Sequence, residues 1–350
     1  MADSGDGSDM PSDQLRARAE ESRAKLWFLL EADRRLVSGA VLVVILASIL
    51  LVGYLHPAGE AVLRNKDPIE TLFQGLLTAT ITGVTLVLTL NQLVLSQELG
   101  AVGDQRERMS KALAFREDAA DAISAPVSPP RPAQFLRALV QVAGDRARDL
   151  RDAVEGGDED LQTAVADLTD SLVENADSVS RSLDDAEFGQ FEVISAALNF
   201  NYSWKIFASE RIAGEYGDEM DEAAHEANER LHDVLTLFGP AREHFKTLYF
   251  QWELINLSRS ILVAAVPALV TSIVMLVFFE VKTYAVTLFG VDTLVLVVGV
   301  AATIGLLPFI ILLAYVLRIA TITKHTLSIG PFILRETDQF EEVEWDRDSL

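Results

Sequence analysis

The chain has 350 residues, of which 50% are hydrophobic, and it carries 52 Asp and Glu against 29 Lys and Arg, a net charge of −23. The absence of cysteine excludes disulfides, thiolate catalysis and zinc–thiolate sites. A surface that binds phosphates needs a basic excess, so we expect no nucleic-acid partner. The length suits two modest domains, or a membrane bundle with one soluble domain.

The acidity has a particular composition, because only seven of the 29 basic residues are lysine. High acidity with scarce lysine is typical of proteins from salt-accumulating halophilic archaea, where strong salt screens the repulsion between like charges. An ordinary acidic protein from a mesophile is the alternative.

The first 35 residues contain two predicted segments. Residues 1–13 are acidic and polar, unlike a signal peptide, and we expect a disordered tail. Residues 14–35 have apolar side chains at helical spacing with basic residues between them, which predicts an amphipathic helix in the membrane interface, with Trp27 at headgroup level. A cytoplasmic extension of the first span is the alternative.

Four apolar runs follow, at about 36–55, 71–95, 260–281 and 285–317, and each is long enough for a helix to cross a bilayer. Asp292 places the start of the fourth span near Thr293. The segments outside these spans are rich in Lys and Arg, whereas the two short connections hold only Arg64, Lys66 and Lys282. The positive-inside rule therefore predicts cytoplasmic termini and a cytoplasmic segment between spans 2 and 3 in the cell membrane.

Residues 97–258 read as a helical cytoplasmic domain of four or five helices. Span 2 is expected to run on as a helix until SAPVSPPRP (124–132) breaks it, and breaks at Gly156-Gly157, Gly217 and Gly239-Pro240 fit turns between helices. The segment 188–207 is apolar and aromatic enough for the centre of a bundle. Three apolar stripes step by three or four residues, and some could pair with other subunits as coiled-coil-like seams. They comprise Leu161, Val165, Leu168, Leu172, Ala176, Val179 and Leu183; Met220, Ala227, Leu231, Val234 and Phe238; and Phe245, Leu248, Trp252 and Ile255.

The strongest metal-like pattern is a doubled Glu-x-x-His, Glu222 with His225 and Glu229 with His232. Di-metal carboxylate bundles use this spacing, but here both copies lie on one helix and opposite to its apolar stripe. We therefore expect these side chains to face water, and we predict no metal and no cofactor. No phosphate-binding glycine loop or nucleophile motif is present, so no catalytic residue is predicted and we do not expect an enzyme.

Span 2 carries an unusual polar stripe. Its members step by three or four residues, fall within an arc of about 80°, and extend along about 37 Å of helix. They are Thr71, Gln74, Thr78, Thr82, Thr85, Thr89, Gln92 and Ser96. Thr80 and Asn91 lie on the other side of the helix, and Gly75 and Gly83, off the stripe, would admit a neighbouring helix.

Two environments would suit this stripe. In one, span 2 from several subunits lines a water-filled conduit, and hydroxyls and amides replace part of an ion's hydration. In the other, the stripe forms a dry seam with a neighbouring helix.

The spans contain no ionisable residue at mid-bilayer depth, which argues against a proton-driven carrier. Pro267 and Pro308 are expected to kink spans 3 and 4, and Gly299, Ala302 and Gly305 to allow close packing.

The end of span 2, LNQLVLSQELG, resembles uncharacterised multi-spanning prokaryotic membrane proteins of haloarchaeal type, in which a Thr-rich helix closes with a similar Gln…Ser-Gln pattern. The likeness covers some 25 residues. It implies a membrane location and no particular chemistry.

The sequence thus predicts an all-α integral membrane protein. It comprises transmembrane hairpins at 36–96 and 259–317, the inserted domain, and a cytoplasmic tail at 318–350. The expected function is a homo-oligomeric channel for small ions or solutes. The alternative is a non-conducting scaffold or sensor whose cytoplasmic helices dock a protein partner or self-assemble.

Overall fold

The computed structural model describes residues 27–28, 32–55, 65–184, 186, 191–281, 287–288 and 291–325. The predicted tail at 1–13, most of the interfacial helix at 14–35 and the chain beyond His325 lie outside these residues. The described chain divides into two compact units: residues 102–249 form the body of unit 1, and residues 32–101 and 250–322 form unit 2. Helix α11 (Glu222–Val277) contributes to both.

Unit 2 contains four helices that are long and apolar enough to cross a bilayer. They are α3 (Arg34–Leu55), α5 (Lys66–Glu98), the second half of α11, and α12 (Thr293–His325). The helix α12 begins at Thr293, as the sequence predicted, and the Asp292 carboxylate accepts a hydrogen bond of 2.8 Å from the amide of Leu294 at its first turn. An antiparallel pair of two-residue strands, β1 (Thr287–Leu288) and β2 (Val291–Asp292), is the only β-structure in the described ranges.

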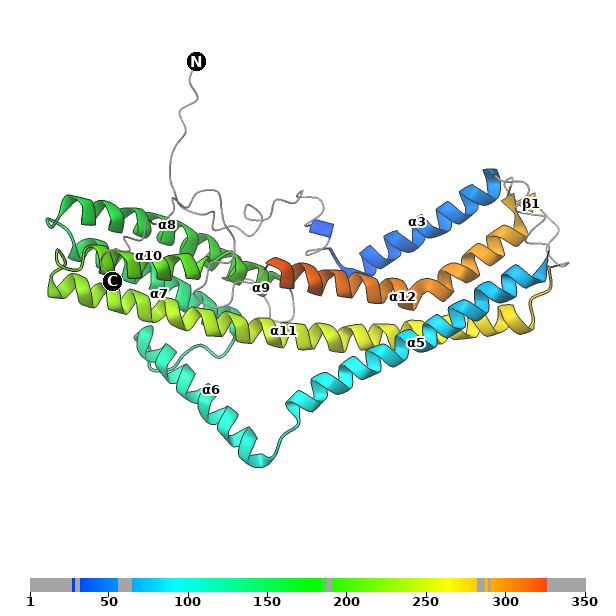
Figure 1. Ribbon diagram of the computed structural model, residues 1–350, viewed down its shortest axis with the longest axis horizontal. Helices are drawn as coiled ribbons and strands as arrows, with labels where there is room; N and C mark the ends of the chain where they lie inside the picture. Colours follow the sequence, from blue (N-terminus) through cyan, green and yellow to red (C-terminus); the bar gives the residue numbers. More distant parts are fainter. Residues whose placement is uncertain are drawn as a thin grey trace, which may run out of the picture. The chain divides into compact units, whose positions relative to one another are not determined.

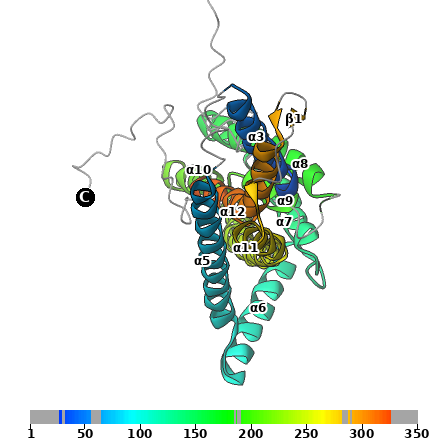
Figure 2. The same cartoon turned by 90° about the vertical axis from the view of Figure 1, so that its right-hand side faces the viewer.

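The helix α12 lies among the other three (Figure 2). Half of the residues in the most apolar stretch of α12 are buried, whereas only 11% are buried in the most apolar stretch of α3. Small residues allow this position: a Cβ on Gly299 would lie 3.1 Å from Ile49 of α3, and one on Gly305 would lie 2.9 Å from Leu76 of α5. Ala302 is buried in the same core. The predicted small-residue surface of span 4 is therefore a packing surface within this chain.

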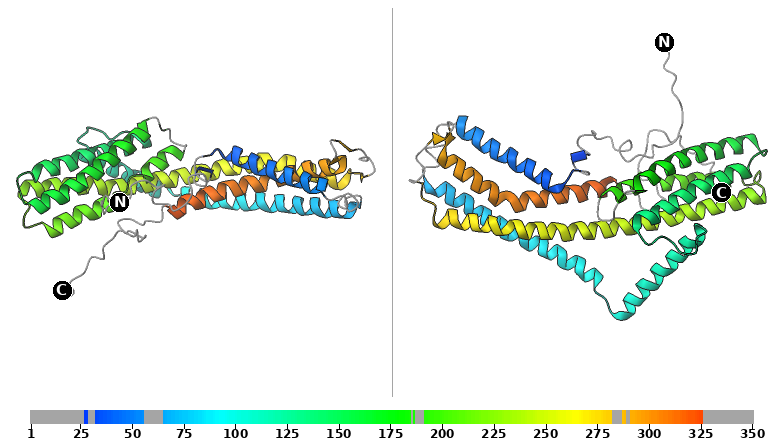
Figure 3. Two further views of the ribbon diagram at one scale, coloured as in Figure 1. Left: turned by 90° about the horizontal axis from the view of Figure 1, so that it is seen from above. Right: turned by 180° about the vertical axis from the view of Figure 1, so that it is seen from behind.

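Unit 1 consists of α6 (Val102–Ala122), α7 (Pro132–Ala153), α8 (Glu159–Asp184), α9 (Phe191–Leu198), α10 (Tyr202–Glu215) and the first half of α11 (Figure 1). In both views of Figure 3, α8 and α10 run alongside that half of α11. Seven members of the first predicted stripe and five of the second are buried in one core. Most of 191–206 is also buried, and Val193, Phe200 and Trp204 belong to the same core. These stripes pack within the chain, so they are not available as seams between subunits.

Two predicted turns are present and one is absent. Gly156, with a φ of 83°, lies in the turn between α7 and α8, and Gly217 lies between α10 and α11. Gly239 and Pro240, by contrast, lie inside α11, which is continuous for 56 residues. Gly239 is needed for packing, because a Cβ there would lie 2.7 Å from the Tyr202 ring. Pro240 is exposed, so water can bond the carbonyl group that its missing N–H leaves free.

Two further expectations need correction. Span 2 does not continue as one helix: α5 ends at Glu98, Leu99 is extended, and α6 begins at Val102. The two glycines nearby, Gly100 and Gly103, disfavour helix at this point. In the third predicted stripe, Trp252 and Ile255 are exposed, at 46% and 58%, and the buried residues of this stretch are Tyr249, Glu253 and Leu257.

Candidate functional site

The polar stripe of α5 forms one uninterrupted exposed face. All eight of its residues are exposed in the chain: Thr71, Gln74, Thr78, Thr82, Thr85, Thr89, Gln92 and Ser96. The buried residues of α5 are Ile69, Phe73, Leu76, Thr80 and Val87. On a helical wheel, the centres of these two sets are about 180° apart. The stripe therefore points directly away from the packing contacts that α5 makes with its own chain.

The hydroxyl groups of the stripe are satisfied by their own helix. Each of the five threonines donates to the backbone carbonyl four residues earlier, at 2.9–3.0 Å, and Ser96 donates to the carbonyl of Leu93 at 2.7 Å. Because the hydroxyl hydrogen is used internally, the outward surface presents methyl groups and oxygen lone pairs. Gln74 and Gln92 add an amide near each end.

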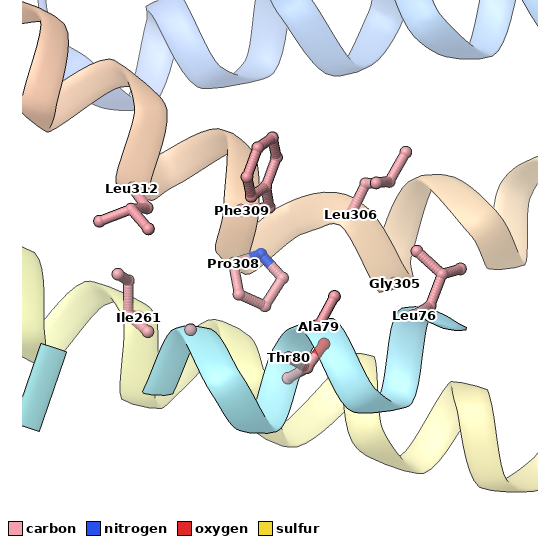
Figure 4. Close-up of a pocket in the computed structure, with 10 residues that line it drawn as sticks. Leu76, Ala79, Thr80, Ile261, Gly305, Leu306, Pro308, Phe309 and Leu312 are labelled. Atoms are coloured by element: carbon pink, nitrogen blue, oxygen red, sulfur yellow. The ribbon is translucent and has the colours of Figure 1, made fainter. Parts of the chain in front are cut away.

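The opposite side of α5 borders a cavity of about 230 Å³ (Figure 4). The cavity is lined by side chains of α5 and α12 that face one another, with Ile261 from α11 closing it. Thr80 contributes the one threonine side chain on this buried face of α5 and is 5% exposed. Pro308, also at the cavity, removes the amide that would bond the carbonyl of Ile304. Apart from Thr80, the side chains that line the cavity are apolar.

Both predicted kink positions lie within continuous helices. Pro267 is inside α11 and Pro308 inside α12. In Figure 4, α12 changes direction at the turn that carries Pro308. Gly75 and Gly83 have open space where a Cβ would be, so within the chain no helix packs closely against either.

Removing the glycine beside the cavity is expected to stabilise the protein. Gly83→Ala adds a methyl group that meets nothing within 4 Å. Because alanine replaces glycine inside a helix, the free energy of unfolding should rise by about 0.5–1 kcal/mol. Gly53→Ala in α3 is the matched change with the opposite outcome. Its Cβ would lie 2.5 Å from Cγ1 of Val295, a stiff branched side chain, and overpacking typically costs about 1–3 kcal/mol. Thermal unfolding in detergent micelles measures both, and a loss of stability in Gly83→Ala would contradict the open geometry.

The sequence did not single out a buried ion pair in unit 2. Arg318 of α12 donates through Nη1 to Oε1 of Glu253 in α11 at 3.0 Å, and the two side chains are only 10% and 6% exposed. Arg318 is one of the basic residues that follow span 4, and Glu253 lies within the predicted apolar stripe from Phe245 to Ile255. The pairing itself has no local sequence signal, because the partners are 65 residues apart.

The doubled Glu-x-x-His lies as expected on the outer side of α11. Glu222, His225 and Glu229 are exposed and His232 is half-buried. Among the described residues no three His, Asp or Glu side chains are grouped so that they could hold a metal ion.

Comparison with known proteins gives one match, a family model that covers residues 1–347 and is described as a family of unknown function (DUF7972). No curated protein and no solved structure matches the chain.

Proposed function

Starting from the premise that the chain belongs to this family of unknown function, DUF7972, we propose that it is a four-span membrane protein that assembles around α5 into a channel for small ions or solutes. The observation that carries the proposal is the complete exposure of the eight-residue polar stripe, directly opposite the buried face of α5. In hydrocarbon, such a face is more favourable against water or the same face of another copy than against lipid.

Large apolar side chains support the membrane location. Many of them are exposed on unit 2, among them Val43, Val44, Val263, Val270 and Phe309, each more than half exposed. A soluble protein rarely exposes so large a contiguous apolar surface, whereas lipid tails cover it without cost. The charge pattern that the sequence shows would then place the termini and unit 1 in the cytoplasm.

The chemistry of the stripe favours cations among the possible permeant species. The threonine hydroxyls present acceptor oxygens, since their hydrogens are donated to α5 itself. Oxygen acceptors replace the hydration of a cation, as carbonyl groups do in selectivity filters, whereas an anion needs donors. Among the residues that the structure describes, the chain has four candidate spans, so a conduit lined by α5 requires several copies.

A non-conducting scaffold is the second candidate, and one observation favours it. Because each threonine hydroxyl is satisfied by its own helix, the stripe could also pack dry, methyl against methyl, between two copies of α5. In that case α5 would serve only to hold subunits together, and unit 1 would dock a partner.

Single cysteines distinguish the two functions, since the natural chain has none. Thr82→Cys and Thr89→Cys are compared with Ile81→Cys and Leu88→Cys. Each control is adjacent to its partner, at nearly the same depth and also exposed, but lies outside the stripe. In a conduit, a water-soluble thiol reagent should label the stripe cysteines roughly tenfold faster, because the thiolate that reacts forms only in contact with water.

Equal protection at all four positions would contradict the channel. A scaffold predicts this protection together with disulfide-linked dimers through Thr82→Cys, and ion flux from reconstituted vesicles at background. Labelling of the controls at the same rate as the stripe would contradict the proposed membrane location of α5 itself.

A further inference from the structure

Unit 1 contains a pocket with an aromatic wall. Its volume is about 500 Å³, and it lies between α6, the start of α7 and the turn of α11 that holds Pro240. Phe115, Phe135 and Phe245 form the wall, with ring centroids 6.1 Å apart for the first pair and 6.0 Å for the second. This volume is within the range of sites that bind a side chain or a small ligand.

The rim of the pocket is basic, in a chain whose net charge is −23. Arg108, Lys111 and Arg116 come from α6, and His244 comes from α11. Arg116 is held in place, because its Nε and Nη2 donate to the hydroxyl and carbonyl of Ser128 at 3.2 and 2.8 Å. Lys111 is 76% exposed and forms an ion pair of 2.7 Å with Glu107 on the same helix. An occupant should therefore combine an aromatic ring with negative charge.

We propose that this pocket binds the C-terminal segment of the same chain, residues 336–350. The segment reads ETDQFEEVEWDRDSL and contains seven Asp or Glu, one Arg, and the two aromatic residues Phe340 and Trp345. One of these rings enters the phenylalanine wall, and the carboxylates beside it face the basic rim. The N-terminal segment 1–13 is also acidic but has no aromatic residue, so it does not offer this combination.

The chain is long enough for this contact. Fifteen residues lead from the end of α12 at His325 to Phe340, and they can extend over about 50 Å. A domain the size of unit 1 has a radius of gyration of only about 15 Å. If α11 and α12 both cross the bilayer, the two crossings return the chain to the side on which unit 1 lies. The inference uses these proposed crossings but not the conduit.

Binding of the segment would join α6 to α11. Only three residues, Leu99 to Ala101, separate α5 from α6. A segment bound to α6 would therefore act close to the cytoplasmic end of the polar stripe.

A cysteine pair in the full-length protein tests the contact. Ala112→Cys lies at the pocket and Val343→Cys lies between the two aromatic residues of the segment. The control pair joins Val343→Cys to Ser178→Cys, exposed on α8, which contributes nothing to the pocket. We expect the pocket pair to form a disulfide within one chain roughly tenfold faster than the control, because binding raises the local concentration of the thiols.

Charge variants then test the basic rim. Lys111→Glu in the pocket pair should remove most of this advantage, whereas Arg106→Glu, the same charge change on α6 outside the pocket, should leave it unchanged. Equal rates for the two pairs would overturn the proposal. Disulfide-linked dimers as the main product would also overturn it, because the segment would then bind another copy.

Discussion

Replacing Arg318 by methionine is expected to destabilise the protein by about 3–5 kcal/mol, because it removes the guanidinium group that pairs with the buried carboxylate of Glu253. Methionine keeps much of the length of the side chain, so the change removes the guanidinium group rather than the packing of its stem. The partners belong to α11 and α12, and the loss should therefore loosen the contact between these two helices. Thermal unfolding in detergent micelles measures the change.

The double variant Glu253→Gln with Arg318→Met separates the charge effect from the loss of packing. Without a buried charge on either side, most of the stability should return, since a buried pair costs desolvation that its attraction barely offsets. The exposed pair of Arg230 with Glu226, also on α11, is the control, and Arg230→Met should cost less than about 1 kcal/mol. A double variant as unstable as Arg318→Met alone would contradict the ion-pair explanation.

The residue pattern predicted the buried faces of α8 and of the first half of α11, because charged and polar residues occupy the opposite sides of these helices. In α8, every apolar residue of the predicted stripe from Leu161 to Leu183 is buried, and the charged residues between them are exposed. Water imposes this separation, so a period of three to four residues marks the core. The outer position of the doubled Glu-x-x-His follows from the same contrast.

The same reasoning fails in the second half of α11. Here the exposed and the buried side chains are both apolar, so hydropathy does not distinguish them. Trp252 and Ile255 are exposed, while Glu253, the charged residue between them, is buried against Arg318. In α5, the polar residues provide the contrast that apolar ones cannot, and the stripe correctly marks one face. Its predicted role, pore or seam, depends on other copies of the chain and stays a prediction.

Gly239-Pro240 shows how tertiary packing overrides a local signal. The dipeptide is typical of a turn, yet α11 continues through it. The Tyr202 ring occupies the space that a Cβ at residue 239 would fill, and the guanidinium group of Arg242 lies over the same ring, with its Cζ 4.6 Å from the ring centroid. Only glycine permits this approach, and nothing in the local sequence reveals the ring that requires it.

The aromatic cluster beside this glycine should be the most sensitive point of unit 1. Phe238 is 1% exposed, and its ring centroid lies 4.7 Å from that of Phe200 and 5.9 Å from that of Tyr202. Phe238→Ala is expected to cost about 3–5 kcal/mol, the range for emptying a buried aromatic site. Its half-buried neighbour Leu237 provides the control, and Leu237→Ala should cost about 1 kcal/mol.

Hydrogen exchange in the full-length protein locates the loss. Since Phe238 belongs to the core shared by α7 to α10 and the first half of α11, exchange should accelerate throughout these helices. The amides of α12 belong to unit 2 and should keep their protection, because local opening follows cooperative units. Equal acceleration in α12 would mean that α11 transmits unfolding along its whole length, and the two units would then be one cooperative structure.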